Sequence, residues 1–163
     1  MIEMSRPVAL DRIGTAAFEQ TVEARPEELR PLAARMGIPA VRRLACAFRL
    51  RRVGDSVIEA EGELEAEVIQ VCVVSLDEFP QTIQDRFTLE FVPAGTEAPD
   101  DDLEAPDQIP YDGSAIDLGE TAAQQLALAL DPYPHKPGAE DLPDEVSGPA
   151  GPFAALAALR SKQ

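Results

Sequence analysis

The chain has 163 residues, of which 30 are acidic and 14 are Lys or Arg, and its formal net charge is −16. This length fits one domain with or without tails, and the negative charge repels phosphate backbones, so a basic protein is favoured as partner over a nucleic acid. No apolar run can cross a bilayer, no apolar signal segment follows Met1, and two cysteines make no disulfide framework, so we expect a cytoplasmic protein without a membrane anchor.

The first predicted elements are a strand over residues 16–24 and a helix that begins at Pro26. Proline is tolerated in the first turn of a helix, and the acids that follow it suit the helix dipole. Gly37 is placed to end this helix, and Pro31 inside it predicts a short or kinked element. Helical spacing is kept by Leu29, Leu32, Ala33 and Met36.

A hairpin over residues 41–76 carries the clearest pattern. Apolar and charged residues alternate on both arms, which is the period of strands with one buried face, and residues 53–56 form the turn. The apolar face consists of Leu44, Cys46, Phe48, Leu50, Ile58, Ala60, Leu64, Ala66, Val68 and Cys72. The other face carries Arg43, Arg49, Arg51, Glu59, Glu61, Glu63, Glu65 and Glu67. We interpret it as a solvated surface on which arginines neutralise glutamates, and not as a carboxylate metal site.

Matching the two faces fixes the register of the hairpin. The expected pairs are Arg51 with Glu59, Arg49 with Glu61, Arg43 with Glu67 and Phe48 with Gly62. In this register the Phe48 ring would fill the space that Gly62 leaves. A slip by one residue would set arginines against the apolar face, so it is disfavoured.

The second arm ends in a continuous apolar run, residues 68–74, which predicts a strand end covered on both faces. A turn around residues 76–80 leads to another strand, in which Ile83, Phe87, Leu89 and Phe91 alternate with polar residues. We therefore expect an α+β fold whose core is residues 1–93. Its architecture would be an antiparallel β-meander or partial barrel with a few packed helices.

Residues 94–116 are rich in acids and prolines and include Asp100, Asp101 and Asp102, so we predict an acidic flexible loop. The next segment, residues 117–134, predicts a helix that packs on the core. Asp117 is a good N-cap, Glu120 completes a capping-box pattern, and prolines end the helix. Its apolar stripe consists of Leu118, Ala122, Leu126, Ala129 and Leu130, widened by Leu128.

Two further segments follow this helix. Residues 135–151 are again rich in Pro, Gly and acids, and we predict a flexible segment. Residues 152–163 predict a short terminal helix, which is too short to persist alone in water. It would either dock on its own domain or fold onto a partner.

Residues that could carry chemistry are scarce. His135, the single histidine, lies in a predicted loop, and Cys72 is expected to be a small buried hydrophobe with no cation beside it in sequence. Structural zinc sites use about four Cys or His ligands, and Cys46, Cys72 and His135 supply three without any pairing. The sequence predicts no catalytic set, no metal and no cofactor, so we expect a protein that is not an enzyme.

The segment from Gln70 to Pro80, followed downstream by Asp117-Leu118-Gly119-Glu120, resembles the YceD family of large ribosomal RNA subunit accumulation proteins. The segment 152–159 resembles the alphaproteobacterial branch of that family. Many relatives carry a second cysteine three residues after the first and more cysteines beyond the helix, a set that could hold zinc. Here Ser75 stands at the second position and no cysteine follows Pro132, so the resemblance implies a member that folds without metal.

The resemblance implies a non-enzymatic factor that supports large-subunit rRNA accumulation and ribosome biogenesis. The charge points to contacts with a basic protein, such as a ribosomal protein or assembly factor. Two alternatives are a direct rRNA-binding protein that uses the arginines between Arg42 and Arg52, and a structural or interaction domain of unknown role. A hydrolase or nuclease would need Cys72 or His135 in a cleft with a partner residue. Candidate partner-binding residues are Cys72, Leu76, Phe79, Asp100, Asp101, Asp102, Asp117, Gly119 and Glu120.

Overall fold

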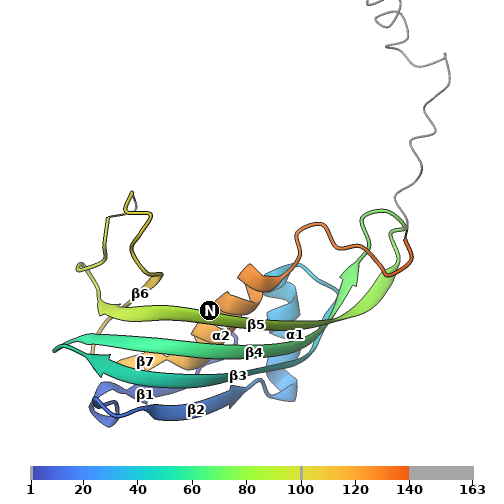
Figure 1. Cartoon of the computed structure of the whole chain (residues 1–163). Helices are drawn as coiled ribbons and strands as arrows, with labels where there is room; N and C mark the ends of the chain where they lie inside the picture. The colour runs from blue at the N-terminus through green and yellow to red at the C-terminus, as the bar shows by residue number, and fades with distance from the viewer. Residues whose placement is uncertain (1, 100, 140–163) are drawn as a thin grey trace, which may run out of the picture.

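The computed structural model describes residues 2–99 and 101–139. The fold is α+β, as predicted, and consists of a five-stranded sheet, a two-stranded sheet and two α-helices (Figure 1). The predicted terminal helix, residues 152–163, and most of the segment 135–151 lie outside the described residues. In chain order the elements are β1 Pro7–Ala9, the 3-10 turn η1 Leu10–Arg12, β2 Phe18–Glu23, α1 Pro26–Met36, β3 Ala40–Val53, β4 Val57–Val71, β5 Glu78–Pro93, β6 Gln108–Tyr111, β7 Ala115–Asp117 and α2 Leu118–Ala129.

The larger sheet has the order β2-β3-β4-β5-β6 and is not closed into a barrel. Its neighbours are antiparallel except for β5 and β6, which run parallel. Strands β1 and β7 form the separate two-stranded sheet. The predicted meander is therefore confirmed for β3, β4 and β5, while the partial barrel gives way to an open sheet.

The hairpin of β3 and β4 has the predicted register: Arg51 opposes Glu59, Arg49 opposes Glu61, Arg43 opposes Glu67 and Phe48 opposes Gly62. A shift between Val41 and Arg43 interrupts it near one end. The space over Gly62 is filled by Phe87 from β5, not by Phe48 as predicted. The Phe87 ring lies so close that a Cβ on Gly62 would collide with it. Phe48 meets Phe87 edge to face, with ring centroids 5.8 Å apart.

The hydrophobic core lies between one face of the sheet and the two helices. Alternate residues of β3 and β4 are fully buried there, together with Leu32 of α1 and Leu118, Ala122 and Leu126 of α2. Helix α1 begins at Pro26 and ends at Met36, and its C-cap Gly37 takes the left-handed conformation with φ 66°. It spans 11 residues with Pro31 inside, a short helix as predicted.

Three expectations about the second half of the chain are wrong. Strand β6 and most of β7 form within residues 94–116, where Ile116 is buried and Ile109 and Tyr111 pack against the core. Leu128 is 77% exposed and does not widen the buried stripe of α2. Glu120 does not close a capping box, since its carboxylate pairs with Arg35 instead.

Candidate functional site

The structure separates the candidate partner-binding residues into three places (Figure 1). Cys72, Leu76 and Phe79 lie where β4 turns into β5. Asp117, Gly119 and Glu120 lie at the N-terminus of α2. Asp101 and Asp102 are exposed in the loop between β5 and β6, at the other end of the sheet, and Asp100 lies outside the described residues. These residues therefore form no single site.

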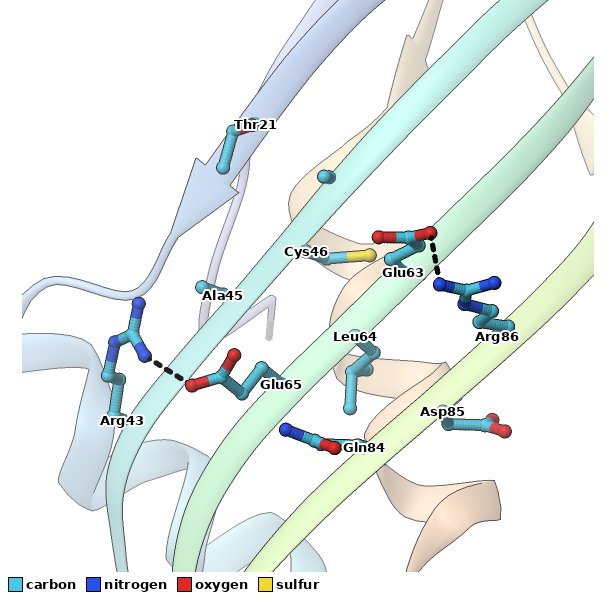
Figure 2. Close-up of a pocket in the computed structure, with 11 residues that line it drawn as sticks. Thr21, Arg43, Ala45, Cys46, Glu63, Leu64, Glu65, Gln84, Asp85 and Arg86 are labelled. Atoms are coloured by element: carbon cyan, nitrogen blue, oxygen red, sulfur yellow. Dashed lines mark hydrogen bonds and ion pairs between the residues drawn. The ribbon is translucent and has the colours of Figure 1, made fainter.

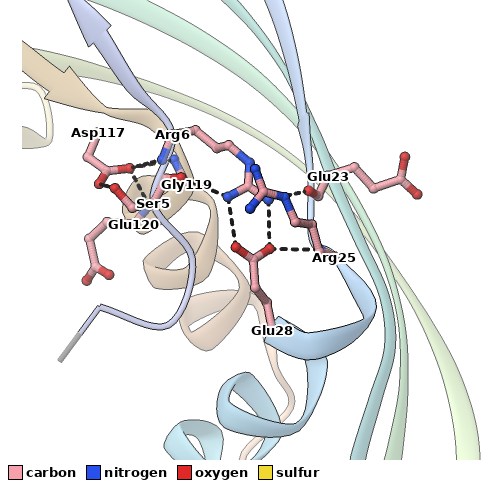
Figure 3. A network of polar contacts seen from close by, with 8 residues as sticks. All are labelled: Ser5, Arg6, Glu23, Arg25, Glu28, Asp117, Gly119 and Glu120. Atoms are coloured by element: carbon pink, nitrogen blue, oxygen red, sulfur yellow. Dashed lines mark hydrogen bonds and ion pairs between the residues drawn. The ribbon is translucent and has the colours of Figure 1, made fainter.

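Asp117 joins the N-terminal segment to α2 (Figure 3). Its Oδ1 accepts hydrogen bonds from the backbone N–H groups of Gly119 at 2.9 Å and Glu120 at 3.1 Å, which confirms the predicted N-cap. The same oxygen accepts from the Arg6 N–H at 2.8 Å, and Oδ2 accepts from Ser5 Oγ at 2.6 Å. These bonds outweigh partial burial and hold the pKa of Asp117 below its ordinary value. Both oxygens of the Asp117 carboxylate therefore already accept hydrogen bonds within the protein.

Gly119 is required by a close approach of two backbones. A Cβ at this position would lie 2.7 Å from the Met4 carbonyl oxygen and 2.9 Å from the Arg6 nitrogen. Glu120 is bound to Arg35 of α1 by two hydrogen bonds of 2.7 and 2.8 Å, and this pairing lowers its pKa. The contacts of Asp117 and Gly119 thus stabilise the fold, and a partner-binding role for these residues stays a prediction.

Arg6 forms a polar cluster that the sequence did not reveal (Figure 3). Its guanidinium makes a bidentate pair with Glu28 at 2.7 and 2.9 Å and donates to the Glu23 carbonyl at 2.9 Å. The Glu28 carboxylate also accepts from the Arg25 N–H at 2.7 Å. This cluster ties the start of the chain to the end of β2 and the start of α1. No spacing in the sequence links Arg6 to Glu28, because the two are 22 residues apart and meet only in the folded chain.

The turn between β4 and β5 packs against the loop that follows α2, and we call the two loops, residues 71–77 and 131–136, the tip. The Val73 N–H donates to the Pro134 carbonyl at 2.9 Å, and Lys136 Nζ pairs with Asp77 at 3.3 Å. Leu76 takes a left-handed conformation with φ 61°, which is unusual for a residue with a side chain. The tip is thus a defined structure in which the side chain of Leu76 is 74% exposed.

Cys72 is closed off from solvent, as predicted. The Ser75 N–H donates to the Cys72 Sγ at 3.4 Å. The side chain and backbone of Ser75, with smaller effects from the backbone of Lys136 and Val74, stabilise the thiolate and lower the pKa of Cys72 to about 6. The Ser75 hydroxyl and nearby backbone amides therefore provide the stabilisation that we sought from a neighbouring cation in the sequence. Cys46 shows the opposite effect, because burial alone raises its pKa to about 12.

The apolar run at the end of β4 is covered on both faces over Val68, Ile69 and Gln70, as predicted. Beyond it, Val71 and Val73 are 37% and 45% exposed. Phe79 is buried, so it supports the turn and is not a surface residue. His135 is exposed in the loop after α2. Within the described residues no three His, Cys, Asp or Glu side chains are grouped to hold a metal ion.

The face of the sheet opposite the helices, which we call the outer face, carries most of the charged strand residues. Glu59, Glu61, Glu63, Glu65 and Glu67 follow one another along β4 at alternate positions. The small residues Ala45 and Ala47 on β3 leave an open hollow between Arg43, Glu65, Glu63 and Arg86 (Figure 2). No described helix or strand covers this hollow.

Ion pairs on the outer face differ in part from those predicted. Arg43 bonds to Glu65 at 2.8 Å and to Glu23 at 3.3 Å, although Glu67 is the residue opposite it. Arg51 pairs with Glu59 at 3.4 Å as predicted. Arg86 of β5 pairs with Glu63 at 3.1 Å.

Comparison with known proteins gives one result. A family model described as large ribosomal RNA subunit accumulation protein YceD matches residues 60–160. No curated protein and no solved structure matches the chain. In the part of the chain that the structure describes, no helix has the length and apolar character needed to cross a membrane.

Proposed function

Because the chain belongs to the YceD family, whose description concerns accumulation of the large ribosomal RNA subunit, we propose that it supports ribosome biogenesis by binding basic proteins on its outer face. The observation that carries this proposal is the continuous row of glutamates on β4, which both helices leave uncovered (Figure 1). The overall charge of −16 adds a long-range attraction for a basic partner.

Part of the glutamate row is available for a partner. In the described residues, Glu61 and Glu67 take part in no ion pair, while Glu59, Glu63 and Glu65 are each held by an arginine. Both unpaired glutamates are exposed. A partner that brought Lys or Arg side chains would therefore find carboxylates without first breaking an internal ion pair.

The spacing of the row suits a polypeptide ligand. Alternate residues of a strand lie about 6.8 Å apart, so the row extends over roughly 27 Å of β4. A basic segment, whether extended or helical, presents Lys or Arg side chains at a similar interval. The small side chains of Ala45 and Ala47 leave room beside the row for long basic side chains (Figure 2).

The arginines proposed for direct rRNA binding are largely occupied. Arg43 and Arg51 pair with glutamates on the outer face. Arg52 donates to the backbone carbonyls of Leu10, Ile13 and Asp55, so it supports the fold. Arg42 and Arg49 remain, and Arg49 lies between Glu19 and Glu61 of the neighbouring strands, whose carboxylates repel phosphate. This favours a protein partner over bare rRNA.

The proposal contains no chemical step, since Cys72 is closed off and His135 lies on an exposed loop. It places the protein in the cytoplasm, where ribosomal subunits are assembled, and the two free thiols support a reducing setting.

The test is binding of the full chain to purified basic proteins of the large ribosomal subunit at several salt concentrations. Glu61→Gln combined with Glu67→Gln is expected to weaken binding about three- to tenfold and to flatten its salt dependence. Asp11→Asn combined with Asp55→Asn is the matched control, because it removes the same charge from exposed positions outside the row.

Two outcomes would overturn the proposal. One is that no basic protein binds at moderate salt. The other is that the control pair of substitutions weakens binding as much as the pair on β4. Tight binding of precursor rRNA, with an affinity that falls steeply as salt rises, would instead support the RNA-binding alternative. In cells, deletion of the gene is expected to lower mature large-subunit rRNA, and the variant with both glutamates replaced should restore it less well than the control.

A further inference from the structure

The tip carries an apolar patch that no described residue covers. Val71, Val73, Leu76 and Tyr133 form it, and Leu76 and Tyr133 are 74% and 70% exposed. The two loops that carry these residues lie side by side, because the Val73 N–H donates to the Pro134 carbonyl at 2.9 Å. Adjoining exposed apolar side chains of this kind mark interaction sites on soluble proteins.

The remainder of the chain begins beside this patch. The loop that bears Tyr133 continues to Ala139, whose N–H donates to the Lys136 carbonyl at 2.9 Å. In Figure 1 this last described stretch passes next to the turn between β4 and β5. Residues 140–163 therefore start at the edge of the patch, and no long connection is needed to reach it.

The sequence of that remainder has the chemistry to cover the patch. Phe153, Leu156 and Leu159 recur every three residues, so a helix would place all three on one face. Arg160 and Lys162 follow them, while the exposed residues around the patch include Asp77, Glu78 and Asp131. Apolar residues would thus meet apolar residues, and bases would meet acids.

We propose that residues 152–160 dock as a helix on the tip of their own chain and cover Val73, Leu76 and Tyr133. The residues between Ala139 and Phe153 can extend over about 45 Å, so the connection restricts neither the position nor the direction of docking. A tether of this length gives an effective concentration near the millimolar range, at which even weak contacts are populated. Docking also provides the apolar burial that so short a helix needs in order to form.

The family match runs to residue 160, so the proposed docking segment lies inside the matched region. The inference does not depend on the proposed function, because the patch is apolar and the glutamate row is not part of it. A docked segment would leave Glu61 and Glu67 open to a basic partner. It would close the tip to other apolar ligands until it is displaced.

The absence of tryptophan from the chain makes a direct test possible. In the full-length Phe153→Trp protein, the new indole is the single tryptophan and reports on the docking segment alone. We expect blue-shifted emission and quenching by acrylamide at least threefold slower than that of free N-acetyltryptophanamide. Adding Leu76→Ser should restore fast quenching, and so should Tyr133→Ser as an independent second variant.

Leu103→Ser is the matched control, because Leu103 is a leucine with 96% exposure in the loop at the other end of the sheet. It should leave the quenching slow and the urea midpoint unchanged, whereas the tip variants should remain folded but lose the small stabilisation that docking provides. Fast quenching in the Phe153→Trp protein itself, or no response to either tip variant, would overturn the proposal. So would protection that disappears on dilution, because the occupant would then be the segment of a second copy.

Discussion

Gly119→Ala should destabilise the protein, although alanine is the better helix former. Gly119 is the second residue of α2, and its backbone passes against the N-terminal segment. An added Cβ would lie 2.7 Å from the Met4 carbonyl oxygen, 2.9 Å from the Arg6 nitrogen and 3.0 Å from the Met4 carbonyl carbon. All three are backbone atoms, so no side chain can rotate away to make room.

The size of the effect follows from opposing terms. Alanine in place of glycine stabilises a helix by up to ~1 kcal/mol. Forcing an extra carbon into a filled space costs about 1–3 kcal/mol. Moving the N-terminal segment away also weakens the bond from the Arg6 N–H to Asp117, and hydrogen bonds to a charged group are worth about 1.5–3 kcal/mol. We therefore expect a net loss of about 2 kcal/mol.

For a protein of this size such a loss lowers Tm by about 4–8 °C. Urea unfolding followed by circular dichroism measures it, with Gly14→Ala as the control, because a Cβ at Gly14 would meet no atom within 4 Å. The control should be neutral or stabilising by up to ~1 kcal/mol. If Gly119→Ala proved more stable than the parent, the steric account of this position would be refuted.

Three further predictions concern other parts of the fold. Gly62→Ala should destabilise by about 1–3 kcal/mol because it displaces the Phe87 ring, and Phe87→Leu in the same chain should recover part of that loss in urea unfolding. Glu28→Gln should cost about 1–3 kcal/mol at pH 7, since it breaks the pair with Arg6. The pKa of Glu28 is lowered from 4.5, so the stability that its ionised form contributes is complete above pH 4.5 and is lost as pH falls through the lower folded value. The stability of the variant should therefore depend less on pH in this acidic range. Folding lowers the pKa of Cys72 from 9.0 to about 6, so the free energy of unfolding should rise between pH 6 and pH 9. Cys72→Ala should remove that rise. Identical pH profiles of stability for the two proteins would contradict the lowered pKa of Cys72.

How far the sequence predicts this fold depends on the range of the contacts. The hairpin register could be predicted because charge and hydrophobicity alternate on both arms, and a slip would bury arginines. The N-cap of α2 could be predicted because Asp117 bonds to residues two and three positions away. Strand β7 was missed because its partner is β1, and Pro7 and Asp117 meet only in the folded chain.

The candidate surfaces likewise combine features that the sequence predicts with contacts that form only in the folded chain. Leu76 and Cys72 were identified by resemblance, but the amide groups that bond to the Cys72 sulfur come partly from Lys136, and no local pattern shows that contact. The free glutamates of the row could not be distinguished from the paired ones, because Arg43 bonds to Glu65 and Glu23 and not to the residue opposite it. Side-chain ion pairs follow the reach of the arginine as well as the register.

The structure also explains how a family match can begin at residue 60 when the fold needs the first strand. Asp117 and Gly119, inside the match, contact Met4 and Arg6 outside it, and they do so largely through backbone atoms. The Arg6 N–H donates to Asp117, the Leu118 N–H donates to the Arg6 carbonyl, and the Met4 carbonyl lies against Gly119. Any residue other than proline supplies these backbone groups. These backbone contacts need an acid and a glycine at the start of α2 but only main-chain groups from Met4 and Arg6, although the side chains of Ser5 and Arg6 make further bonds to Asp117 and Glu28. A sequence-based match can accordingly detect the motif and not the strand that the motif holds.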